Sequence, residues 1–232
     1  QFHIWARPII AVANPETIAA LLRDRPDGFH RSERLSAIAE DMGFNGVFSA
    51  NGDAWRRQRP MVMASFDPRH IKTYFPALAR VTERFEKRWR RATAAGETID
   101  LQADLMRYTV DVTSGLAFGV DINTLESDAE VIQMHLDQVF PALFRRLMAP
   151  FPYWTWLRDR KLDKHLDALQ RAVQDFIGQA RRRMEANPAL RENPTNLIEA
   201  MIAARDNPGS GLTDADVAGN VLTMLLAGED TT

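Results

Sequence analysis

The chain has 232 residues, 29 basic and 31 acidic side chains, and a formal net charge of −2. This balance gives no electrostatic reason to expect nucleic acid or an anionic membrane as a partner, and we predict no nucleic-acid binding. The chain contains no cysteine, which excludes disulfides and any thiolate supplied by these residues. No apolar run approaches the roughly 18 residues of a membrane-spanning helix. We therefore expect a cytoplasmic location, with an anchor upstream of Gln1 as the alternative.

Two short strands are predicted at the front of the chain. Residues 2–5 and 9–12 are rich in β-branched and aromatic side chains and flank Arg7 and Pro8. The sequence therefore predicts a small β element within residues 1–14.

A helix followed by a long loop is predicted next. Asn14 before Pro15 is a helix start signal, because asparagine caps the first turn and proline fits the first helical position. The predicted helix ends at Leu22. Residues 26–50 have no sustained period, and a loop of this length inside a compact domain is usually functional or mobile.

Helical patterns dominate from residue 51 onward, with start and stop signals between them. The predicted helices begin near residue 51, then cover 68–93, 101–118, 128–148, 158–185 and 194–205, and a last one begins after Thr213. Pro60 is expected to kink or shorten the first of these, and Thr98 and Ile99 to add a brief strand. The predicted fold class is mainly α, with a small β element at the N-terminus.

The last predicted helix ends in an unusual hexapeptide. Thr213 and Asp216 form a capping box, and an apolar run leads into Ala227-Gly228-Glu229-Asp230-Thr231-Thr232. An acid beside an alcohol on an apolar helix is costly to bury unless both groups are paired or used. These residues therefore mark either a functional site or simply the last turn of a helix.

Helical spacing places several residues of this helix on one face. Asn220, Thr223, Ala227 and Thr231 lie three or four residues apart, and Gly228 adjoins Ala227. Small side chains at these positions let a flat group approach the backbone. The hydroxyl of Thr231 beside the acid of Asp230 could pass protons into an apolar site.

A second candidate is the pair formed by Trp55 and Arg59. Four residues apart, they share one helix face, so an indole N–H and a guanidinium can together hold a carboxylate. The alternative is a surface cation–π stack of arginine on tryptophan. Arg56 and Arg57 point elsewhere, and we expect them to form an exposed basic patch.

No other motif indicates chemistry. The five histidines lack a metal-ligand spacing such as His-Glu-x-x-His, so no metal site is predicted. Core packing is the default expectation for the aromatic residues between 151 and 156, with a ligand-channel lid or a membrane contact as alternatives.

Together the two motifs resemble the cytochrome P450 superfamily. Trp55-x-x-x-Arg59 resembles the C-helix motif of that family, and residues 227–232 match its I-helix motif of small-Gly-x-acid-Thr-Thr at every position. The resemblance covers the whole chain and implies the N-terminal part of a P450-like helical fold. It divides a single incomplete domain, 1–232, into strands (1–14), B helix and B–C loop (15–50), helices C to H (51–212) and the start of the I helix (213–232).

The resemblance also implies a site and a reaction. Ala227 and Gly228 would lie over the distal face of a haem, and Trp55 and Arg59 would hold one of its propionates. Thr231 and Asp230 would be the catalytic residues that deliver protons during oxygen activation. The parent protein would insert one oxygen atom of O2 into an apolar small molecule.

Further expectations concern the surroundings of this site. Residues 42–50, the helix before Pro150 and the aromatic loop after it would border the substrate pocket. Arg56 and Arg57 would face the side where an electron-donor redox protein or reductase domain docks.

The same resemblance predicts that the chain alone is inactive. The family holds its haem iron through a cysteine thiolate, and this chain has no cysteine. We therefore expect the chain not to bind haem stably by itself. The alternative is a non-catalytic helical interaction or ligand-binding module that self-associates through its exposed haem-side face.

Overall fold

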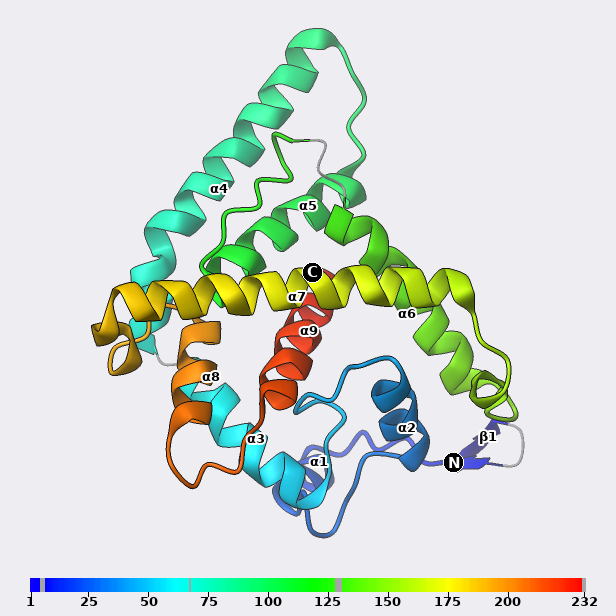
Figure 1. The fold of residues 1–232 in the computed structure, drawn as a ribbon. Coiled ribbons are helices and arrows are strands. Elements are labelled where there is room, and N and C mark those ends of the chain that lie inside the picture. Colours follow the sequence, from blue (N-terminus) through cyan, green and yellow to red (C-terminus); the bar gives the residue numbers. More distant parts are fainter. Residues whose placement is uncertain (5–6, 67, 128–130, 231–232) are drawn as a thin grey trace.

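The computed structural model describes residues 1–4, 7–66, 68–127 and 131–230, and their regular structure is almost entirely helical (Figure 1). Strands β1 (Phe2–Ile4) and β2 (Arg7–Ile9) pair antiparallel, with Phe2 opposite Ile9. The predicted second strand began too late, because Arg7 and Pro8 belong to β2. Proline lacks an N–H but is tolerated on a strand of an edge pair such as this one.

The first two helices show how local capping decides helix formation. Helix α1 (Pro15–Arg23) begins as predicted, with the Asn14 side chain accepting a hydrogen bond from the Thr17 N–H at 2.8 Å. Helix α2 (Glu33–Asp41) lies where an irregular loop was predicted. Its cap is Ser32, whose hydroxyl accepts from the Leu35 N–H at 3.2 Å. In a nine-residue helix the apolar residues repeat too few times to give a clear helical pattern, so this cap is the main sequence signal for α2.

Helix α3 (Gly52–Ser65) continues through Pro60, so of the two expected effects of Pro60 the shortening is wrong and the kink stays a prediction. Proline leaves the carbonyl four residues earlier, that of Arg56, without its helical partner. Both residues are exposed, so water can satisfy that carbonyl. The helix therefore tolerates a proline on its solvent side.

Helices α4 (Pro68–Ala95) and α5 (Leu101–Thr113) pack against each other. Between them, Thr98 and Ile99 form no strand, contrary to the prediction. Helix α5 passes into a π-helical turn, Ser114–Phe118, which ends at Gly119 with a φ of +63°. Glycine adopts this left-handed conformation without strain, as the predicted stop requires.

The remaining helices are α6 (Val131–Met148), α7 (Arg160–Ala186), α8 (Leu197–Asp206) and α9 (Asp214–Asp230). Helix α8 begins later than predicted because its cap is Asn196, which accepts from the Glu199 N–H at 3.0 Å. Helix α7 crosses the molecule. Helix α9 lies in the middle of the molecule and packs against α5, α7 and α8 (Figure 1). The C-terminal helix is therefore at the centre of the hydrophobic core.

A histidine pair joins α6 to α7. The Nδ1 atoms of His135 and His165 lie 2.7 Å apart, so one ring donates a hydrogen bond to the other. Burial, followed by the nearby His165 and Arg171, lowers the pKa of His135. A base whose pKa is lower in the folded state binds protons more readily when unfolded.

We therefore predict that acidification destabilises the fold through His135. The free energy of unfolding should fall as the pH falls through the unfolded histidine pKa of about 6.5. Chemical denaturation between pH 8 and pH 5 measures this change. The His135→Gln variant should have a shallower pH dependence over this interval, and an unchanged slope would contradict the assignment.

Candidate functional site

Helix α9, which carries Ala227 and Gly228, begins with the hydrogen bonds of a capping box. The Thr213 N–H donates to the Asp216 carboxylate at 2.8 Å, and the Asp216 N–H donates back to the Thr213 hydroxyl at 3.2 Å. This confirms the predicted capping box. The apolar face that follows is buried, including Val221 and Leu225.

Ala227 and Gly228 face different surroundings in the structure. Ala227 lines an apolar cavity. A methyl group added to Gly228 would lie 2.5 Å from the Thr113 hydroxyl oxygen, so this glycine lets α9 approach α5 closely. Asp230 ends α9, but its side chain and Thr231 lie outside the described residues. The catalytic roles of Asp230 and Thr231 stay predictions.

The apolar cavity has a volume of about 180 Å³ and is bordered by α2, the loop after it, α6 and α9. Its lining is apolar apart from one threonine: Leu35, Ala39, Phe44, Phe48, Phe140, Leu143, Thr223, Leu226 and Ala227. The Thr223 hydroxyl donates to the Gly219 carbonyl at 2.7 Å, so it is occupied within its own helix. The arrangement suits an apolar ligand, because burial of apolar surface is its main source of affinity.

The aromatic loop after Pro150 contributes no residue to this lining, unlike residues 42–50 and α6. Trp154 is buried, and the guanidinium carbons of Arg34 and Arg146 lie 4.9 and 5.7 Å from its ring centre. Trp156 is 71% exposed. The expectation of core packing therefore holds for Trp154 and is wrong for Trp156.

Trp55 and Arg59 lie on α3 in the geometry of a cation–π pair. The Arg59 guanidinium carbon is 5.9 Å from the centre of the Trp55 ring, and that of Arg25 lies at the same distance of 5.9 Å. This geometry is compatible with carboxylate binding as well as with a cation–π stack, because stacking leaves the N–H groups of Trp55 and Arg59 able to bind an anion. Arg25 is a third member that the sequence did not reveal.

Arg25 and Arg31 contain buried donors that have no hydrogen-bond partner within residues 1–4, 7–66, 68–127 and 131–230. These atoms are Nε and Nη2 of Arg25 and Nε of Arg31. Burial, and then the charge of Arg25, lowers the pKa of Arg31. Buried N–H donors without acceptors are costly, and an anion that accepted from them would relieve that cost.

Two acids of this region, Asp27 and Asp53, pair with a different arginine. Asp27 and Asp53 both pair with Arg56, the latter at 2.7 Å. Arg56 is therefore neutralised rather than part of an exposed basic patch, whereas Arg57 is exposed as expected. Arg25, Arg31, Arg59 and Trp55, here called the cationic cluster, together suit a ligand with carboxylate groups at its edge.

The cationic cluster adjoins the apolar cavity. The guanidinium carbon of Arg31 lies 4.8 Å from the ring centre of Phe48, which lines that cavity. The backbone of Arg31 is held in place by Asn51, whose side-chain oxygen accepts from the Arg31 N–H at 2.7 Å. The cationic cluster and the apolar cavity are therefore neighbours.

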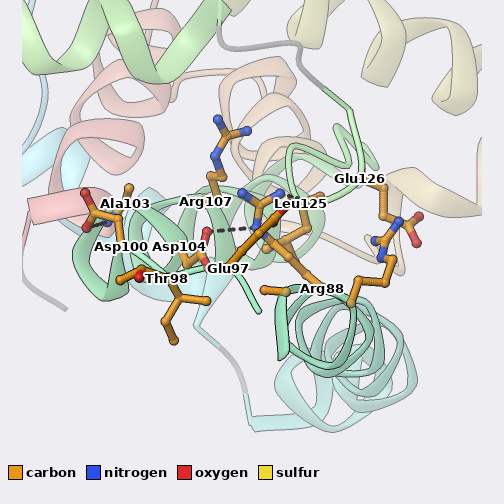
Figure 2. A pocket seen from close by; sticks show the side chains of 12 residues that line it. Arg88, Glu97, Thr98, Asp100, Ala103, Asp104, Arg107, Leu125 and Glu126 are labelled. Atoms are coloured by element: carbon orange, nitrogen blue, oxygen red, sulfur yellow. Dashed lines mark hydrogen bonds and ion pairs between the residues drawn. The ribbon is translucent and has the colours of Figure 1, made fainter. Parts of the chain in front are cut away.

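A larger cavity of about 420 Å³ lies between the end of α4 and the start of α5 (Figure 2). One ion pair joins its two walls: Arg88 Nε donates to one carboxylate oxygen of Asp104 at 2.8 Å, and the neighbouring Trp89 Nε1 donates to the other oxygen at 2.9 Å. Asp104 thus has a structural role. None of the buried polar atoms that lack a hydrogen-bond partner among the described residues belongs to this lining, so this cavity is a weaker candidate than the cationic cluster.

A protein-family comparison decides the identity of this architecture. The family model described as Cytochrome P450 matches residues 1–232, the whole chain. The chain belongs to the cytochrome P450 family. This confirms the resemblance seen in the motifs and the mainly α, P450-like fold with its small β element.

Curated P450 proteins from plants and mammals are similar over nearly the whole chain. Cytochrome P450 CYP94D108 of Paris polyphylla is 27% identical over 96% of this chain and 45% of its own length. Cytochrome P450 86B1 of Arabidopsis thaliana is 26% identical, covering 94% and 41%. Cytochrome P450 4F6 of Rattus norvegicus is 23% identical, covering 97% and 44%. The chain therefore spans less than half the length of these P450 relatives.

The comparisons leave the cellular location of this P450 chain a prediction. One relative, 21% identical, is named Protein LUTEIN DEFICIENT 5, chloroplastic, of Arabidopsis thaliana. Within the described part of the chain, no helix combines the length and apolar character needed to cross a membrane.

Proposed function

We propose that the chain is the N-terminal part of a haem-thiolate monooxygenase that inserts one oxygen atom of O2 into an apolar organic substrate. The observation that carries this proposal is the cationic cluster beside an apolar cavity. Haem has two carboxylates on one edge of a flat apolar ring. Unpaired buried guanidinium donors next to apolar side chains match both properties.

The proposed roles follow from the chemistry of each side chain. Arg25, Arg31 and Arg59 would bind the haem carboxylates, with the Trp55 indole N–H as a further donor. The small side chain of Ala227 leaves room beside α9. When bound, haem supplies the activation of dioxygen.

The cavity and the end of α9 have separate proposed roles. The apolar lining excludes water and holds the substrate through burial of its surface. Asp230 and Thr231 are proposed to deliver protons from the end of α9. An electron-donor redox protein or reductase domain would supply electrons, with the exposed Arg57 as part of its docking surface.

The axial thiolate must come from outside these 232 residues, since they contain no cysteine. We propose that the isolated chain is inactive and does not hold haem stably. We also propose that α1 corresponds to the B helix, α3 to the C helix and α9 to the start of the I helix.

The carbon monoxide spectrum of the reduced protein tests this function. A protein that carries the whole P450 fold and contains this chain should give the red-shifted Soret band of a thiolate–CO complex. The isolated chain mixed with haem should not give it. Absence of the band from the whole protein, or its presence with the chain alone, would overturn the proposal.

A further inference from the structure

A buried network of amide side chains joins α9 to the loop that follows α2. Asn220, on α9, is only 1% exposed. Its side-chain oxygen accepts from the Val47 N–H at 2.8 Å, and its nitrogen donates to the Gln58 side chain at 3.0 Å and to the Asp216 carbonyl at 2.7 Å. Both donor hydrogens of this amide are therefore used.

Gln58 completes the network from α3. It is 3% exposed, and its nitrogen donates to the Asn45 carbonyl at 3.2 Å and to the Asp216 carboxylate at 2.7 Å. The other oxygen of that carboxylate accepts from Thr213 in the capping box. Because each unsatisfied buried amide group is costly, the network favours one relative position of α3, α9 and the loop.

Two glycines let the loop lie directly on α9. A methyl group on Gly219 would come within 2.8 Å of the Asn45 carbonyl carbon, which real side chains do not approach. A methyl group on Gly46 would come within 2.9 Å of the Gly219 carbonyl oxygen and closer still to the Thr223 hydroxyl. Neither contact leaves space for the loop to shift toward the helix.

This attachment lies between the two parts of the candidate site. Phe44 and Phe48 flank the attached segment, and both line the apolar cavity. Gln58 is on the same helix as Trp55 and Arg59 of the cationic cluster. One pair of amides therefore connects the aromatic wall of the cavity to the helix that presents the cluster.

We propose that Gln58 and Asn220 are positioning residues that determine ligand selectivity, because they hold the loop on α9 and so place the Phe44 and Phe48 rings. The inference rests on the proposed function only in taking the apolar cavity as the ligand site. It assigns no contact between either amide and the ligand.

Probe binding to the 232-residue chain tests the inference. The fluorescence of 1-aminoanthracene reports binding of a flat probe, and decan-1-ol competes as a slender one. In the Asn220→Leu variant, which keeps the side-chain size but removes the hydrogen bonds, the ratio of the two dissociation constants should change about tenfold. Gln58→Met is a second variant, with the same expectation, in case the first fails to fold.

Two further variants separate selectivity from stability and from non-specific binding. Leu125→Ala removes a buried side chain that lies outside the lining of the apolar cavity, on the larger cavity between α4 and α5, and outside the main core cluster. It should lower stability while leaving the ratio unchanged. Leu143→Trp should fill the cavity and abolish binding of both probes.

The outcomes distinguish the inference from the function on which it rests. A changed ratio in the amide variants alone, with faster hydrogen exchange of the Val47 amide, supports the inference. An unchanged ratio overturns it and leaves the proposed function intact. Failure of the wild-type chain to bind either probe, or binding that survives Leu143→Trp, overturns the cavity as ligand site and the inference together.

Discussion

Replacing Arg25 and Arg31 together with glutamine is expected to weaken haem binding by about 100-fold, because hydrogen bonds to charged groups contribute roughly 1.5–3 kcal/mol each. Their buried donors lack partners among the residues that the structure describes. Glutamine keeps a polar head but removes the charge. The rate of haem transfer from the whole P450 protein to an excess of a haem-scavenging apoprotein measures the loss.

Arg57→Gln is the matched control for this double variant. Arg57 is exposed, lies on α3 beside the cationic cluster and belongs to no part of it. The control should release haem at the wild-type rate. If the double variant also releases haem at that rate, Arg25 and Arg31 do not hold the carboxylates.

Replacing Glu199 with alanine is expected to destabilise the fold by about 3 kcal/mol, near the lower end for breaking a buried ion pair. Glu199 is 0% exposed and accepts from Arg183 Nε at 3.0 Å and from the Thr195 N–H at 3.0 Å. Arg183 is a third exposed and also donates to the Phe118 carbonyl, which limits the cost. Urea denaturation of the chain measures the change.

The pH dependence of the same variant provides an independent check. Burial raises the pKa of Glu199, but hydrogen bonds from Thr195 and Arg183 outweigh it, so the pKa is lowered overall. Such a group stabilises the fold above its unfolded pKa of about 4.3, and this contribution disappears as the pH falls through the folded value.

Glu199→Ala should therefore lose less stability on acidification than the wild type does. The exposed Glu192→Ala is the control and should change stability by less than about 0.5 kcal/mol. A similarly small change for Glu199→Ala would contradict the structural role of the buried carboxylate.

The parts of the fold that sequence alone predicts are those with short-range signals. Asn14 and Thr213 cap their helices, and Gly119 stops one, as their residue types indicate. Such signals depend on hydrogen bonds within a few residues, so neighbouring letters are enough to find them. The order of the other helices follows from the same local patterns, whereas the family membership rests on the resemblance of the two motifs and on the family-model match.

The missed features depend on contacts between distant segments. Whether Pro60 ends a helix depends on which side of α3 faces solvent, and α2 is held by burial of Ile38 and Ala39 as much as by its cap. Arg25 and Arg31 are ordinary loop arginines in the sequence. Only the fold shows that their donors are buried and that Asp27 and Asp53 form ion pairs with Arg56 instead.

The most direct test of the account compares haem with its dimethyl ester, which has the same flat ring but no carboxylates. Both are bound to the whole P450 protein that contains this chain, and the two dissociation constants are measured by absorbance. The account predicts that haem binds at least about 100-fold more tightly than the ester, and that the Arg25→Gln, Arg31→Gln variant removes most of this preference. Equal affinity for haem and ester would contradict the central claim that the cationic cluster holds the haem carboxylates.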